Sequence, residues 1–116
     1  MGFHVCMIGT RGQQGIRKMT SNLVSCPGRC SDVREVVDYV HAKFCNDNSR
    51  RIYAAGFSIG GNKLAKMVGL DGPSSKLSGA YCCQPPLKYW ETINNLKQAY
   101  FGIFDKVAGM KVSLLH

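Results

Sequence analysis

Arg51-Ile-Tyr-Ala-Ala-Gly-Phe-Ser-Ile-Gly-Gly-Asn-Lys-Leu-Ala-Lys-Met-Val-Gly69 is the stretch that decides the fold of this 116-residue chain. Residues 52–55 form a short apolar run, which is typical of a buried strand. Further on, Leu64, Met67 and Val68 recur at the spacing of one helix face. Between the two segments, residues 56–60 match the pattern G-x-S-x-G. A strand, a sharp turn and a helix around this pattern predict a nucleophile elbow, a turn that exposes a serine at its tip.

Ser58 is the candidate nucleophile of this turn. We expect Gly56 and Gly60 to be required, because side chains two positions away on either side would collide with the backbone of such a strained turn. The turn also directs the positive end of the following helix, and the backbone N–H of Ile59, toward an oxyanion formed beside Ser58. A glycine-rich turn that carries an incidental serine is the alternative interpretation of the same residues.

Composition indicates a globular chain, with 45% hydrophobic and 19% charged residues. The length suits one small domain, residues 1–116, or a part of a larger one. The formal charge is +8, but the basic residues are scattered and form no dense run. We therefore interpret them mainly as solvated surface and expect no nucleic acid as a partner, with a membrane surface as the secondary interpretation. No apolar run is long enough to span a bilayer, and no signal-peptide pattern begins the chain.

The six cysteines suit neither a metal site nor a disulfide framework. They are Cys6, Cys26, Cys30, Cys45, Cys82 and Cys83. The spacing from Cys26 to Cys30 is wrong for a zinc knuckle, and no matching Cys/His pair follows downstream. We expect free thiols in a reducing compartment, with no metal and no cofactor.

The order of apolar segments predicts an α/β fold. Strands are expected over residues 3–8, 52–55 and 77–83; helices are expected from Ser31, from Ile59, over residues 87–96 and over residues 100–115. The first helix has a capping-box spacing at Asp32 and Glu35, followed by the apolar stripe Val33, Val36, Val37, Val40 and Phe44. This βαβαβα order predicts a mostly parallel, three-stranded sheet with flanking helices.

A glycine loop at residues 9–15 follows the first expected strand. Its spacing is G-x-x-G-x-x-G and not G-x-G-x-x-G, and no helix opens directly after it. A dinucleotide-binding fold is therefore disfavoured, because such a fold presents a helix N-terminus to the pyrophosphate.

Three runs together resemble the YheT-type α/β-hydrolases, which include plant embryogenesis-associated proteins and animal abhydrolase-domain lipases. They are Gly2-Phe-His-Val-Cys-Met7 with Thr10-Arg-Gly12, Asp32-Val-Arg-Glu-Val-Val37, and Ala54-Ala-Gly-Phe-Ser-Ile-Gly-Gly-Asn62. Gly9 stands where the family usually has Asn. The resemblance implies part of an α/β-hydrolase fold. It also implies an enzyme that hydrolyses carboxylic esters, such as acylglycerols or other lipid esters. In that family Ser58 would match the nucleophile and Ile59 the second oxyanion donor.

The resemblance also implies that parts of the catalytic apparatus lie elsewhere. The other oxyanion loop of the family precedes these motifs, and its triad acid and histidine follow the elbow, so residues 1–116 resemble the central section of one hydrolase domain. We do not expect Asp105 or His116 to serve as that acid and base, because both fall in the expected helical tail. An α/β-hydrolase-like binding module without catalysis is the alternative. The expected location is the cytoplasm or the cytosolic face of a membrane.

Overall fold

The computed structural model describes residues 2–9, 26–45, 49–103 and 106. The chain divides into two compact units, Met1–Pro85 and Pro86–His116. The first unit contains α1 (Ser31–Phe44), β1 (Tyr53–Phe57), α2 (Ile59–Asp71), the 3₁₀ turn η1 (Gly72–Ser74) and β2 (Gly79–Cys83). The second contains α3 (Tyr89–Gln98) and the 3₁₀ turn η2 (Ala99–Gly102).

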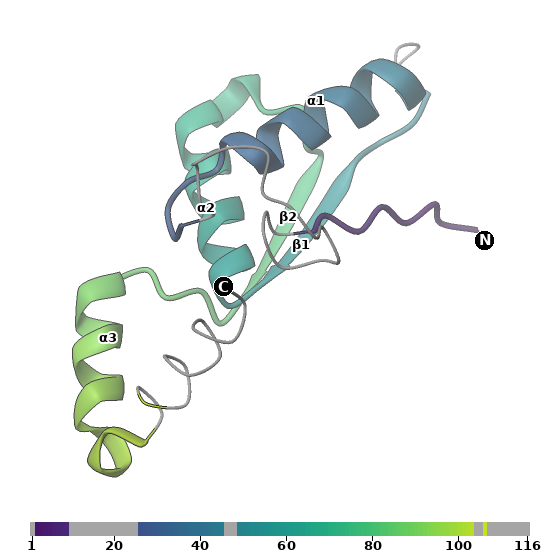
Figure 1. Cartoon of the computed structure of the whole chain (residues 1–116). Coiled ribbons are helices and arrows are strands. Elements are labelled where there is room, and N and C mark those ends of the chain that lie inside the picture. The colour runs from purple at the N-terminus through teal and green to yellow at the C-terminus, as the bar shows by residue number, and fades with distance from the viewer. Residues whose placement is uncertain (1, 10–25, 46–48, 104–105, 107–116) are drawn as a thin grey trace, which may run out of the picture. The chain divides into compact units, whose positions relative to one another are not determined.

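Strands β1 and β2 form a two-stranded parallel sheet in the part of the chain that the structure describes (Figure 1). The register runs from the pair Tyr53 and Gly79 to the pair Phe57 and Cys83. Helix α2 connects the two strands. Parallel strands need such a crossover connection, because a tight turn reverses the chain and joins only antiparallel strands. The described architecture is therefore a β–α–β unit preceded by one helix.

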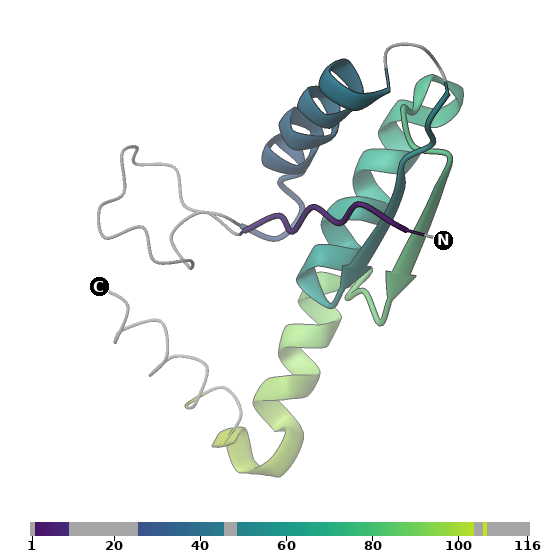
Figure 2. The ribbon, with the colours of Figure 1, turned by 90° about the vertical axis from the view of Figure 1, so that its right-hand side faces the viewer.

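One face of the sheet carries the hydrophobic core of this unit. Helices α1 and α2 lie on the same side of the strands (Figure 2). The buried cluster consists of Cys30, Val37, Leu64 and Met67, with Val33, Ala54, Val68, Leu77 and Cys82 packed against it. Met67 is the most deeply buried of the four, at 1% exposure. Leu64 and Met67 thus supply the core side of α2, as their helical spacing predicts.

The other face of the sheet is open among the described residues. Side chains alternate between faces along a strand, so Tyr53 and Phe57 project away from α2. They are 63% and 65% exposed, and Tyr81 on β2 is 64% exposed. Gly79 lies opposite Tyr53, and a Cβ on Gly79 would come within 3.0 Å of the Tyr53 ring. Among the described residues of the first unit, helices therefore cover one side of the sheet only.

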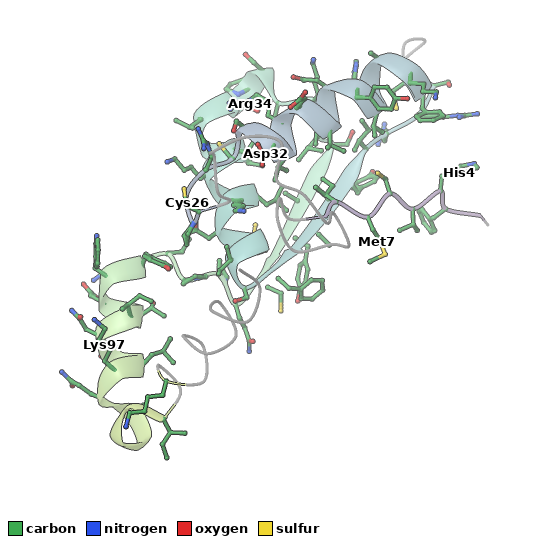
Figure 3. All side chains as sticks on the ribbon, in the orientation of Figure 1. His4, Met7, Cys26, Asp32, Arg34 and Lys97 are labelled. Carbon is green, nitrogen blue, oxygen red and sulfur yellow. The ribbon has the colours of Figure 1, made fainter. Side chains whose placement is uncertain are left out.

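Two ion pairs connect α1 with the end of α2 and the segment after it. Arg34 on α1 (Figure 3) binds Asp71, the last residue of α2. The hydrogen bond that Arg34 donates to the Asp71 carboxylate is the largest cause of the raised pKa of the Arg34 guanidinium. Lys76 Nζ lies 2.6 Å from Asp38 Oδ1, and both of these side chains are almost half exposed. Exposed pairs of this kind contribute little, so the core and not the ion pairs joins the two helices.

The predicted elements around the elbow are confirmed, with small shifts of their ends. Strand β1 ends at Phe57, two residues later than expected, and β2 covers the last five residues of the expected strand over 77–83. Helix α1 begins at Ser31 as predicted, but its N-cap is Cys30 and no side chain caps it, so the capping box is wrong. Phe44, at the end of the expected apolar stripe, is 47% exposed.

The strand expected over residues 3–8 is not formed, so the three-stranded sheet is wrong for the described residues. Residues 2–9 (His4 and Met7 in Figure 3) have no regular secondary structure, and Phe3, Val5 and Met7 are all more than 80% exposed. An apolar run becomes a strand only where a neighbouring edge accepts its backbone hydrogen bonds. The run itself does not supply that edge.

The second unit contains the helix expected over residues 87–96. Helix α3 (Tyr89–Gln98) follows Pro85 and Pro86, and none of its described side chains is buried. Trp90 is 78% exposed. Most of the helical tail expected over residues 100–115, and residues 10–15 of the glycine loop, lie outside the described residues.

Two leucine-sized side chains on α2 test where the core lies. We expect Met67→Ala to lower the free energy of unfolding by about 2–5 kcal/mol, because it leaves a cavity in the buried cluster. The matched control is Leu70→Ala on the same helix, since Leu70 is 64% exposed and its truncation opens no cavity. Urea unfolding followed by circular dichroism measures both changes. Equal losses in the two variants would contradict the described core.

Candidate active site

Ser58 occupies a backbone conformation that a serine rarely adopts. Its φ is 51° and its ψ is −121° at the junction of β1 and α2. Among the described residues other than glycine, Ser58 and Gln84 alone have positive φ. Such a conformation costs about 1–3 kcal/mol and persists only where surrounding contacts impose it. The predicted strained turn, with a helix that begins at Ile59, is confirmed.

The Ser58 hydroxyl does not cap the helix that follows it. Serine at an N-cap normally has an extended backbone and accepts a hydrogen bond from the first helical turn. Here Ser58 makes no side-chain cap bond. Its backbone makes two bonds instead: the carbonyl accepts from Asn62 N–H at 3.0 Å, and the N–H donates to the Cys83 carbonyl, also at 3.0 Å. Ser58 is exposed, so its hydroxyl is available at the carboxyl end of β1.

Gly56 and Gly61 make the tight turn possible. A Cβ on Gly56 would lie 2.7 Å from the Gly60 carbonyl oxygen, and a Cβ on Gly61 would lie 2.9 Å from the Gly56 carbonyl oxygen. Real Cβ atoms do not approach so closely, so both positions require glycine. A Cβ on Gly60 would meet nothing within 4 Å. The steric requirement expected at Gly60 is therefore wrong, and it falls on Gly61.

The first turn of α2 presents unpaired donors beside Ser58. The N–H groups at the start of a helix, Ile59 among them, have no partner within the helix. They carry the positive end of the helix dipole, which favours a negative charge nearby. Asn62 serves the structure on this turn: its Oδ1 accepts the Gly28 N–H at 3.1 Å and so ties the segment before α1 to α2. The turn can thus stabilise an oxyanion through the N–H of Ile59.

No histidine among the described residues is hydrogen-bonded to Ser58. His4 lies in the irregular segment 2–9, and His41 lies on α1. His116 and Asp105 lie outside the described residues. The described part of the chain thus contains the candidate nucleophile and the candidate oxyanion donor, and no described histidine is hydrogen-bonded to Ser58.

The cysteines and the other metal-ligating side chains form no second site in the described part of the chain. All six cysteines are free, and Cys30 and Cys45 are buried. No three His, Cys, Asp or Glu side chains of the described residues come together as metal ligands would. None of the described helices is long and apolar enough to cross a membrane.

Two residues of this site did not stand out in the sequence. Gly61 could have been found from the Gly60-Gly61 pair, since a doubled glycine at a helix start has no benefit for helix formation. The unusual backbone of Gln84 could not have been found, because a residue before proline is expected to have an extended backbone. Its φ is 46°.

Comparisons of this chain with protein-family models, with curated proteins and with solved structures find no match. The described geometry therefore defines the site by itself: a serine on a strained strand-to-helix turn of a parallel α/β unit.

The two glycines that flank Ser58 at equal distance should respond differently to a methyl group. We expect Gly56→Ala to lower the free energy of unfolding by roughly 1–3 kcal/mol, because its Cβ overlaps backbone atoms that cannot move aside. Gly60→Ala is the control and should leave stability unchanged or raise it by up to about 1 kcal/mol, since alanine favours a helix. Thermal unfolding of the two variants checks this. A larger loss in Gly60→Ala would contradict the described turn.

Proposed function

We propose that the chain is part of a serine hydrolase that cleaves carboxylic esters, acylglycerols or other lipid esters among them, through an acyl-enzyme on Ser58. The observation that carries the proposal is the backbone of Ser58, with φ 51° and an exposed side chain that does not cap α2. Strain of this kind is found where a function requires it. The sequence resemblance to YheT-type α/β-hydrolases supports the same reaction and the same fold.

In this mechanism Ser58 Oγ attacks the ester carbonyl carbon while a histidine accepts the hydroxyl proton. The carbonyl oxygen becomes an oxyanion, which the Ile59 N–H and the N-terminus of α2 stabilise. Collapse of the tetrahedral intermediate breaks the bond to the alcohol, which leaves with the proton from the histidine. Water then attacks the acyl-enzyme by the same steps and releases the acid. The resemblance places the histidine and its acid after the elbow in the chain.

A binding module of the same fold without catalysis is the second candidate. It is favoured by one observation, the lack of a hydrogen bond between Ser58 and any described histidine. A fluorophosphonate probe separates the two candidates in a parent form that includes the triad Asp and His, because it labels a serine that a base activates. Labelling that disappears in Ser58→Ala supports the hydrolase.

The proposed partner is a small ester or lipid at a membrane surface. The formal charge of +8 favours approach to anionic headgroups. Phe57 and Ile59, on either side of Ser58 in sequence, are 65% and 43% exposed. Exposed apolar side chains beside the nucleophile suit an acyl chain. The proposed location is the cytoplasm or the cytosolic face of a membrane, and no cofactor is invoked.

Activity should depend on Ser58 and on a base, which the resemblance places after the elbow and which no described histidine supplies. We expect this chain alone to leave p-nitrophenyl esters unhydrolysed above background, because serine without a histidine is a weak nucleophile. A parent form extended to include the triad Asp and His that the resemblance implies should hydrolyse them. Ser58→Ala in that form should lose several orders of magnitude in kcat. Released p-nitrophenol gives the rate.

The control for this experiment is Ser74→Ala, which removes an exposed hydroxyl from η1 and should leave the rate unchanged. A parent form with the triad Asp and His that hydrolyses no ester would contradict the proposed function. Ser58-dependent hydrolysis by the 116 residues alone would show that the base is misplaced, with His116 the first residue to test.

A further inference from the structure

Gln84 lies beside Ser58 at the carboxyl edge of the sheet. Phe57 on β1 pairs with Cys83 on β2, so Ser58 and Gln84 are the next residues along the two strands. Adjacent strands are about 4.8 Å apart. The hydrogen bond from Ser58 N–H to the Cys83 carbonyl, at 3.0 Å, extends this pairing into the turn. The two residues therefore leave the sheet as neighbours.

The backbone of Gln84 is strained in the same sense as that of Ser58. Its φ is 46°, although residues that precede proline favour an extended backbone. The strained turn is fixed against the elbow helix at Gly61: a Cβ there would lie 3.3 Å from the Cys83 carbonyl oxygen and 3.3 Å from the Pro85 Cβ. The structure thus imposes two costly conformations side by side, and only one of them belongs to the nucleophile.

We propose that Gln84 is a specificity-determining residue of the Ser58 site, which hydrogen-bonds a free hydroxyl on the alcohol part of the ester. This inference rests on the proposed function. A carboxamide both donates and accepts hydrogen bonds, which matches a hydroxyl, and it is uncharged, so it does not favour a phosphate or a carboxylate. The side chain of Gln84 is exposed and available to a ligand.

The surroundings of Ser58 fit an amphiphilic substrate of this kind. Phe57 and Ile59 offer exposed apolar surface next to the nucleophile, while Gln84 offers a polar group on the neighbouring strand. An ester with an acyl chain and a hydroxylated alcohol, such as a monoacylglycerol, presents the same two kinds of surface. A plain alkyl ester presents only the first.

The test compares two substrates that differ only in hydroxyl groups, 1-monooctanoylglycerol and propyl octanoate. Wild type, Gln84→Gly and Gln84→Glu are assayed in the parent form that includes the triad Asp and His, with the released acid titrated at constant pH. We expect Gln84→Gly to lower kcat/KM for the monoacylglycerol by about tenfold, the effect of one lost hydrogen bond, and to change kcat/KM for the propyl ester less than twofold. Gln84→Glu, which keeps the acceptor oxygens but loses the donor, should fall between wild type and Gln84→Gly.

Gln84→Gly should fold, because glycine adopts positive φ at no steric cost. An equal loss on both esters would make Gln84 a structural residue of the elbow and overturn the proposal, as would no change on either. These outcomes leave Ser58-dependent hydrolysis intact. Wild-type protein that hydrolyses neither ester would overturn the proposed function, and this inference with it.

Discussion

The close approach of β1 and α2 at Gly56 and Gly61 is the constraint on which the rest of this structure depends. The Gly56 carbonyl oxygen occupies the space that a side chain on Gly61 would need, 2.9 Å from the position of its Cβ. Helix α2 can therefore start directly against the strand that precedes it. One residue, Ser58, is left to reverse the chain direction, and it does so with a φ of 51°.

That geometry also organises the second strand. The turn leaves the Ser58 N–H pointing along the sheet, where it binds the Cys83 carbonyl at the end of β2. Gly61 makes room for the same carbonyl and for Pro85. The strain at Gln84 thus follows from the packing that strains Ser58. Two side chains with different chemistry, a hydroxyl and a carboxamide, are held at one edge as a result.

The sequence predicts the strand, the strained turn and the helix around Ser58 well because their signals are local. The strand, the turn glycines and the apolar spacing of α2 all fall within residues 51–69, and the spacing of Leu64 and Met67 identifies the buried side of the helix. The apolar run at residues 3–8 misleads because a strand needs a partner edge, which no local pattern reveals. The positive φ of Gln84 is not predicted for the opposite reason. A tertiary contact overrides the local preference of a residue before proline.

Replacement of Ser58 by glycine and by alanine tests the central claim, that the elbow holds this residue in a strained backbone. Neither variant has the hydroxyl, so the difference in their free energies of unfolding reports the backbone alone. Alanine normally stabilises a chain relative to glycine by about 0.5–1 kcal/mol. At positive φ the order reverses. There the alanine Cβ lies too close to the following carbonyl oxygen, which costs about 1–2 kcal/mol. We predict that Ser58→Gly is the more stable variant in urea unfolding. A Ser58→Ala protein as stable as Ser58→Gly, or more so, would contradict the strained elbow.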